Sequence, residues 1–170
     1  MSETKKAKTV AESRVETYHL IRPEDLNDAG RLFGGRLVEW IDEVAAMVGR
    51  RHARMPITTA SIDNLKFLHP AFKGDIVILN GKVTHVGNTS MEVKVETYVE
   101  DVEGRSLINR AFLTLVGLDG NNHPAALPQL IVETDEEKTE WERAEQRRRI
   151  RKEQRREGFH FYGDNSVKSM

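Results

Sequence analysis

A single segment, residues 36–51, most constrains the fold of this chain. Its sequence, RLVEWIDEVAAMVGRR, is apolar almost throughout, and only Glu39, Asp42 and Glu43 interrupt it before the closing arginines. A helix that is apolar on nearly every side is buried on most of them. We therefore expect a central helix enclosed by the rest of the domain, with basic residues at its C-terminal end, where the helix dipole favours cations.

Beyond this helix the spacing of apolar residues changes to two, which is typical of β-strands. Four strands are predicted after the helix and a shorter one before it: residues 57–68, 75–86, 89–100 and 105–118, and residues 14–22. In the clearest strand Met91 and Val93 share one face, while Glu92 and Lys94 share the other. Turn signals separate the strands, so short connections favour an antiparallel meander. The order of elements indicates an α+β fold, with a sheet curled around its own helix.

The 170 residues divide into three predicted parts. Residues 1–13 are polar and lysine-bearing, without the apolar stretch of a secretory signal, and we expect a disordered lead. Residues 14–130 form the globular domain, and residues 131–170 form a charged helix and a tail. The helix is predicted at 134–157, with acidic residues first and basic residues last. Because it lacks a strong apolar stripe, we expect this helix to be solvated rather than packed on a neighbouring subunit.

The composition excludes several classes of function. The chain has no cysteine, so it has no disulfide, no thiolate zinc site and no cysteine nucleophile, which fits a cytoplasmic protein. The formal charge of −1 argues against a cationic nucleic-acid binder, and acids near the arginine-rich stretch 147–152 favour a solvated helix face there. No apolar run reaches the roughly 20 residues of a membrane helix. The six scattered histidines show no metal-ligand spacing, so we expect no metal.

Asp42 is the first candidate for chemistry. A carboxylate in so apolar a helix requires hydrogen bonds or charged partners, or it faces a cavity or a subunit boundary. Glu43 points about 100° away from it, so the two acids do not share a place. In a partly dry site Asp42 would serve as a general base or nucleophile. The alternative is that Asp42 and Glu43 mark a narrow solvated edge of the helix.

The entrance of the helix is the second candidate. No Ser, Thr, Asp or Asn lies immediately before Gly34 and Gly35 to cap the first amides. Uncapped amides at a helix N-terminus bind oxyanions, whereas a plain tight turn is the alternative interpretation. In the preceding loop, the Asn27 amide would orient a carbonyl or a water, or it would simply form an Asx-turn.

These motifs, taken in order, resemble those of the hotdog-fold acyl-CoA thioester hydrolases, in particular the cytosolic acyl-CoA hydrolase type. The resemblance covers roughly residues 14–130 and leaves out the charged C-terminal helix. It rests on the loop from Asn27 to Gly35, on Trp40-Ile41-Asp42-Glu43, on Thr59-Ala60-Ser61-Ile62-Asp63, on Gly74-Asp75 and on Gly87-Asn88-Thr89-Ser90-Met91.

The resemblance implies a hotdog fold, in which an antiparallel sheet wraps a central helix. It also implies homodimers with active sites at the dimer interface, often assembled as a trimer of dimers, a hexamer. Asp42 is then catalytic and Asn27 acts with it from the other subunit. The amide of Gly35, with Gly34 beside it, polarises the thioester oxygen, and Thr58 or Thr59 holds a water or the acyl carbonyl.

The resemblance also implies that the turn from Gly87 to Ser90 lies along the pantetheine and phosphates of coenzyme A. This assigns Gly87, Asn88, Thr89 and Ser90 to substrate binding. Cations such as Arg54 would meet the phosphates. No metal or redox cofactor is expected.

The expected function is hydrolysis of acyl-CoA to a free fatty acid and coenzyme A, with Asp42 as general base or nucleophile. Two alternatives remain at this stage. One is an acyl-CoA sensor that binds without turnover, because a fold does not fix a function. The other is a related dehydratase acting on acyl thioesters, for which His69 is the candidate histidine.

Overall fold

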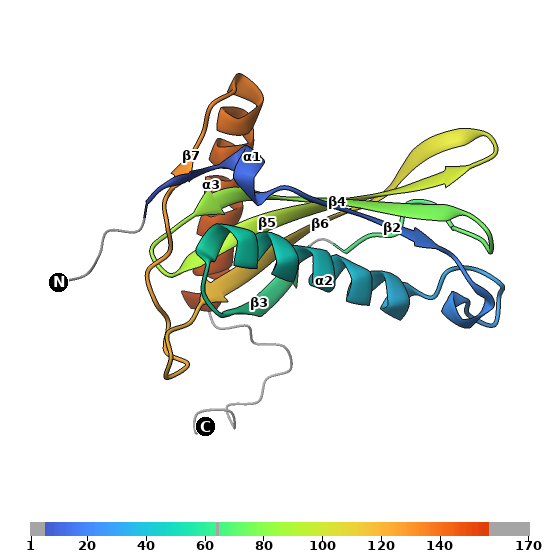
Figure 1. Cartoon of the computed structure of the whole chain (residues 1–170), viewed down its shortest axis with the longest axis horizontal. Helices are drawn as coiled ribbons and strands as arrows, with labels where there is room; N and C mark the ends of the chain where they lie inside the picture. Colours follow the sequence, from blue (N-terminus) through green and yellow to red (C-terminus); the bar gives the residue numbers. More distant parts are fainter. Residues whose placement is uncertain (1–5, 64, 157–170) are drawn as a thin grey trace.

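The structure is a computed structural model, and it describes residues 6–63 and 65–156 (Figure 1). Its elements, in chain order, are β1 (Lys8–Thr9), α1 (Val10–Ser13), β2 (Val15–Leu20), the 3-10 helix η1 (Pro23–Asp25), α2 (Gly34–Ala53), β3 (Ile57–Asp63), β4 (Ile76–Val86), β5 (Ser90–Asp101), β6 (Gly104–Gly117), β7 (Leu130–Ile131) and α3 (Asp135–Arg156). Within the described residues, no helix is both long and apolar enough to cross a membrane.

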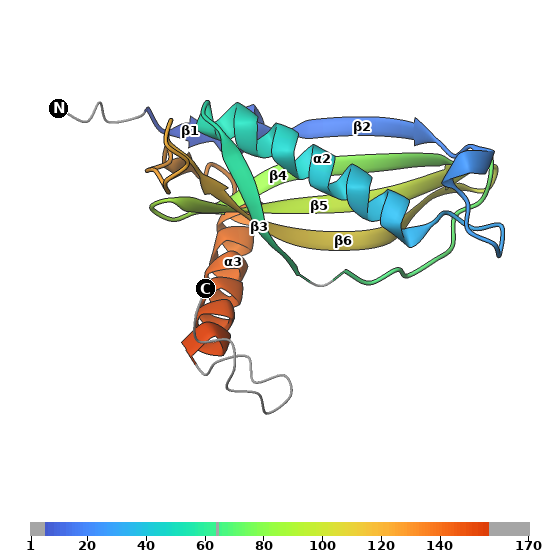
Figure 2. The same ribbon diagram turned by 90° about the horizontal axis from the view of Figure 1, so that it is seen from below.

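Five antiparallel strands form the main sheet, in the order β2-β4-β5-β6-β3. The long helix α2 lies across one face of it (Figure 2). This is the hotdog arrangement, and it confirms the predicted α+β fold. The expected meander holds for β4, β5 and β6, but β3 pairs with β6 rather than with β4. Because β2 already occupies the free side of β4, the chain crosses the sheet face as α2 and enters the opposite edge as β3.

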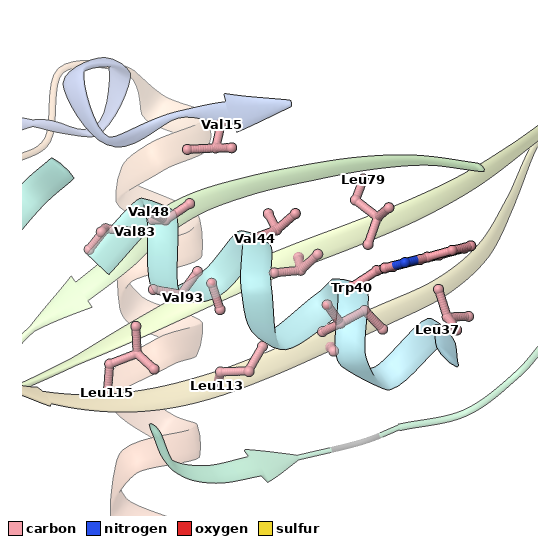
Figure 3. Packing of buried hydrophobic residues seen from close by; sticks show 14 of the residues in the cluster. Val15, Leu37, Trp40, Val44, Val48, Leu79, Val83, Val93, Leu113 and Leu115 are labelled. Atoms are coloured by element: carbon pink, nitrogen blue, oxygen red, sulfur yellow. The ribbon is translucent and has the colours of Figure 1, made fainter. Parts of the chain in front are cut away.

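The core lies between α2 and the sheet (Figure 3). Burying each aliphatic side chain there contributes roughly 1.5–3 kcal/mol. Gly81 permits the close approach, because a methyl group at its Cα would lie 2.7 Å from Val44 Cγ1 and 2.8 Å from Val48 Cγ2. The main contributors from helix and sheet are Leu37, Trp40, Ile41, Val44, Ala45, Val48, Leu79, Val83, Val93, Leu113 and Leu115.

The other face of α2 is open in the single protomer. Glu39, Glu43 and Arg50 are exposed, and Met47 exposes 42% of its surface. The expectation of a helix buried on most sides is therefore wrong for one chain alone, because the sheet covers a single face of α2.

The expected disordered lead is wrong for residues 8–13, which form β1 and α1. Lys8 and Thr9 pair in parallel with Leu130 and Ile131. The Lys8 Nζ also donates to the carbonyl oxygens of Arg51 and His52, 2.8 Å from each, at the C-terminal end of α2. These partners are distant in sequence, so local composition does not reveal them. Residues 1–5 of the lead lie outside the described residues.

The C-terminal helix α3 packs on the sheet face opposite α2, so the expectation of a solvated helix is also wrong (Figure 1). The Glu92 side chain, only 2% exposed, accepts hydrogen bonds from Arg147, Arg151 and Thr84. Ionic contacts replace the missing apolar stripe, because the charged face of β5 matches the charges of α3. The predicted tail from residue 157 onward lies outside the described residues.

Candidate active site

Asp42, in the middle of α2, contacts Thr59 on the edge strand β3. The Thr59 hydroxyl donates to Asp42 Oδ1 over 2.7 Å, and both side chains are half-buried. Strand alternation turns Thr59 toward α2 and leaves Thr58 exposed, which separates two threonines that the sequence alone left equivalent. Among the described residues, the second carboxylate oxygen of Asp42 accepts no hydrogen bond, so it is available to a water or a substrate. Glu43 is exposed and points elsewhere, as expected.

The N-terminus of α2 has no side-chain cap. Phe33 precedes the helix without a capping hydrogen bond, and the first backbone bond of the helix runs from the Leu37 amide to the Phe33 carbonyl over 3.2 Å. The amides of Gly34 and Gly35 therefore have no intrahelical acceptor. A methyl group at Gly35 would lie 2.4 Å from Cε1 of the Phe33 ring, so a side chain at this position would require the exposed ring to move. This end of α2 is suited to bind a negatively charged oxygen.

Asn27 forms the Asx-turn, which is one of the two interpretations that the sequence left open. Its Oδ1 accepts the backbone amides of Ala29 (3.0 Å) and Arg31 (3.1 Å), which is an Asx-turn. Because the turn holds the oxygen, the Nδ2 group is the part of the side chain left to donate. Asn27 and Gly34 line the same cavity of about 430 Å³, together with His69.

The predicted coenzyme A residues lie at the opposite end of α2 (Figure 1). The Gly117 amide donates to the Thr89 carbonyl over 2.9 Å, and this bond fixes the turn at residues 87–90 beside the start of β3. Arg54 ends α2 in the left-handed conformation, with φ 53°. With Arg50 and Met47, Arg54 borders a groove of about 610 Å³. Gly35 and Arg54 are separated by about 28 Å of helix, so one protomer divides the predicted site between its two ends.

Other polar groups near α2 have structural partners. His19 stacks on Trp40 with ring centroids 4.3 Å apart, and burial lowers the pKa of His19.

Sequence reasoning overlooked Arg148 of α3, which lies against Gly87. The only signal in the sequence was that Arg148 belongs to an arginine-rich run. In the part of the chain that the structure describes, no three His, Asp or Glu side chains are grouped as a metal ion would require.

Comparison with known proteins identifies the family of this chain. A model of the thioesterase superfamily matches residues 29–105. A Bacillus subtilis protein, described as an uncharacterized acyl-CoA thioester hydrolase, is 38% identical over 156 residues, which are 91% of either chain. The chain belongs to the hotdog-fold acyl-CoA thioester hydrolases. The cytosolic acyl coenzyme A thioester hydrolase of Rattus norvegicus is also a relative, 35% identical over 138 residues, but the match spans 36% of that longer protein.

Solved acyl-CoA hydrolases share the whole fold. An apo-hexameric acyl-CoA thioesterase superposes with a TM-score of 0.84 at 39% identity, covering 88% of this chain and 97% of the other. An acyl-CoA hydrolase from Staphylococcus aureus, in complex with butyryl coenzyme A and coenzyme A, has a TM-score of 0.83 at 36% identity, covering 89% and 93%. Structures of that enzyme also carry alanine in place of an asparagine, an aspartate or a threonine. Those three positions have the same mutual spacing as Asn27, Asp42 and Thr59.

Proposed function

We propose that the protein hydrolyses acyl-CoA to a free fatty acid and coenzyme A, using Asp42 as general base or nucleophile. The observation that carries the proposal is the hydrogen bond from Thr59 to Asp42, which orients one carboxylate oxygen and leaves the other free. As a base, Asp42 takes a proton from the water that attacks the thioester carbon. As a nucleophile, it forms a mixed anhydride that water then cleaves. In both routes the carbon–sulfur bond breaks and coenzyme A leaves.

The uncapped N-terminus of α2 would stabilise the negative charge that develops on the thioester oxygen. The Gly35 amide donates to that oxygen, and the Asn27 Nδ2 group orients it or the attacking water. Asp42 lies about 10 Å along the helix from Gly35 of its own chain, which is too far for both to act on one thioester. The proposal therefore combines Asp42 of one protomer with Asn27 and Gly35 of a second.

The open surfaces of the protomer support a shared site. Within residues 6–63 and 65–156, no strand pairs with the outer edge of β3, where Thr58 and Ala60 are exposed. An open edge invites pairing with a second strand. The exposed face of α2 lies beside that edge. A two-fold copy would cover both, and it would bring the Asn27 end of one chain toward the coenzyme A end of the other. We propose the dimer as the minimal active unit and a trimer of dimers as the assembly, in line with the hexameric relative.

Substrate binding is assigned to the end of the protomer at which α2 finishes. Gly87, Asn88, Thr89, Ser90 and Thr58 would contact the pantetheine arm, and Arg54 would meet a phosphate. The proposed chemistry requires no metal or redox cofactor, because Asp42 and the amides supply the base and the oxyanion site. The relation to cytosolic acyl-CoA hydrolases supports a cytoplasmic location.

A thiol-release assay over short, medium and long acyl-CoAs tests the proposal. Asp42→Asn should lower kcat by about 10²–10⁴-fold, the range for loss of a general base, with an unchanged melting temperature. Glu43→Gln is the matched control, and it should retain wild-type kcat if its oligomeric state is unchanged. Near-wild-type turnover by Asp42→Asn would overturn the catalytic assignment. Binding of acyl-CoA without thiol release would favour a sensor, and hydration of an enoyl thioester without thiol release would favour a dehydratase.

A further inference from the structure

The helix α3 brings one arginine onto the turn between β4 and β5. A methyl group at Gly87 would lie 3.4 Å from Nη2 of Arg148 and 3.7 Å from its Cζ, so the guanidinium packs on the bare Cα of this glycine. The helix α3 therefore reaches the turn from the sheet face opposite α2.

Arg148 differs from its neighbours in how its charge is compensated. Arg147 and Arg151 are mostly buried and are paired with Glu92. Arg148 is 53% exposed, and its ion pair with Glu145 is long, at 3.6 Å. The same Glu145 oxygen is also bonded to His85, so it is shared. Arg148 thus presents a largely uncompensated positive charge to solvent beside the turn.

The backbone carbonyls of the turn are occupied, whereas its side chains remain free to donate hydrogen bonds. Each of its four backbone carbonyls already accepts a hydrogen bond: that of Gly87 from Gln129 Nε2, and those of Asn88, Thr89 and Ser90 from backbone amides. By contrast, the side chains of Asn88, Thr89 and Ser90 make no hydrogen bond within residues 6–63 and 65–156. A rigid turn with free amide and hydroxyl donors beside a guanidinium is chemically suited to a phosphate group, which accepts but does not need to donate.

We propose that Arg148 binds a phosphate group in the nucleotide part of the substrate's coenzyme A, together with the side-chain donors of the turn. The inference rests on the proposed function and deepens it, because it assigns α3 a part in substrate recognition. The turn is adjacent to the groove bordered by Arg50 and Arg54. Gly117 is bonded to Thr89 of the turn, and the next residue, Leu118, donates its amide to the carbonyl of Pro56, which lines that groove. The nucleotide end of the substrate would therefore meet Arg148 of α3 as well as Arg50 and Arg54 at the C-terminal end of α2.

The test compares Arg148→Gln with Arg149→Gln, which removes the same charge from the exposed neighbour on the same helix. Arg148→Gln should raise KM for acyl-CoA about tenfold with kcat unchanged, as expected for loss of a charge-assisted hydrogen bond. The KM for the matching acyl-pantetheine, which lacks the nucleotide, should not change. Arg149→Gln should leave both values as in the wild type, and Arg148→Lys should restore part of the loss. Acyl-dephospho-CoA separates the two phosphate sources: insensitivity to Arg148→Gln assigns the 3′-phosphate, and sensitivity assigns the diphosphate.

Binding of coenzyme A, measured by calorimetry on the same variants, distinguishes failure of this inference from failure of the proposed function. If Arg148→Gln weakens coenzyme A binding about tenfold while the wild type hydrolyses nothing, Arg148 keeps its assignment and hydrolysis is wrong. The inference is overturned if KM and coenzyme A affinity are unchanged. It is equally overturned if KM rises as much for acyl-pantetheine as for acyl-CoA, or if Arg149→Gln has the same effect.

Discussion

Thr59 and Asp42 join the edge strand β3 to the central helix through a hydrogen bond of 2.7 Å. This bond makes the orientation of the proposed catalytic carboxylate depend on the register of β3, which pairs only with β6 among the residues that the structure describes. Strand pairing therefore positions the carboxylate, and a side chain on a sheet edge becomes part of the site.

Replacing Thr59 with valine tests that dependence. Thr59→Val keeps the branched shape but removes the hydroxyl donor, so Asp42 loses its orienting bond. We expect kcat to fall about tenfold with KM little changed, since a hydrogen bond of this kind contributes about 1–1.5 kcal/mol. Thr59→Ser, which retains the hydroxyl, should recover most of the loss. A Thr59→Val enzyme with wild-type kcat would show that the bond does not orient the reacting carboxylate.

Subunit mixing tests whether Asn27 and Asp42 meet across a dimer interface. Asn27→Asp keeps the oxygen that forms the Asx-turn and removes the amide donor, so it isolates the proposed role from the structural one. Alone, this variant and Asp42→Asn should both be nearly inactive. After subunit exchange at equal amounts, about a quarter of the sites should carry both native residues, from the two-fold symmetry of the dimer. If activity does not return after exchange has been verified by mass spectrometry, the sites are not shared.

The buried contacts of α3 lead to a prediction about stability. Glu92→Gln leaves the two paired arginines without their shared counter-charge in a region closed to water. Breaking one side of a buried ion pair costs about 3–5 kcal/mol. We expect a loss near the lower end, because Arg147 also pairs with Glu140 and Arg151 also pairs with Asp63. Denaturant unfolding at fixed protein concentration measures it. Glu153→Gln, an exposed change on the same helix, should stay within about 0.5 kcal/mol of the wild type. Equal stability of the two variants would mean that the ion pairs of Glu92 contribute little to the fold.

The spacing of apolar residues along the sequence predicts the helices and strands of this fold but not how the strands pair. The central helix and the five strands of the main sheet follow from spacings of about 3.6 and 2 residues, and the structure confirms each of them, although β3 ends at Asp63 rather than at residue 68. Pairing partners are a different matter, because β3 and β6 are distant in sequence and nothing in either strand specifies the other. The same applies to Lys8, whose partners are carbonyl groups at the end of α2.

The sequence identified individual residues of the candidate site but not which of them contact one another. Asp42 and the uncapped glycines are recognisable because a carboxylate in an apolar helix and a helix without a cap both break the usual pattern. Which threonine faces Asp42 depends on the pleat of β3, and sequence gave no means to assign it. The sequence analysis interpreted the charges of Glu92 and Lys94 separately from those of α3. Only the structure shows that this face of β5 contacts the charged side chains of α3.

His52 should make stability depend on pH. Its ring is fully buried, and its Nε2 lies 2.8 Å from the Pro128 carbonyl, so Nε2 carries the proton that is donated. The other nitrogen, Nδ1, has no partner among the described residues. Protonation would place an unpaired N–H and a charge in the core. Burial accordingly lowers the pKa of His52 below its ordinary value of 6.5.

Between that lowered pKa and 6.5 the unfolded chain binds more protons than the folded chain, so the folded state loses stability as pH falls through this window. The free energy of unfolding should be nearly constant above about pH 7.5 and should decrease below pH 6.5, by at most about 1.4 kcal/mol per pH unit for each such histidine. His52→Gln retains a donor for Pro128 without a titrating group, so it should flatten part of the slope. The rest should remain, because burial also lowers the pKa of His19 and His85. Denaturant titrations of the wild type and His52→Gln from pH 5.5 to 8 measure the slope. A slope in His52→Gln equal to that of the wild type would show that His52 has no such role.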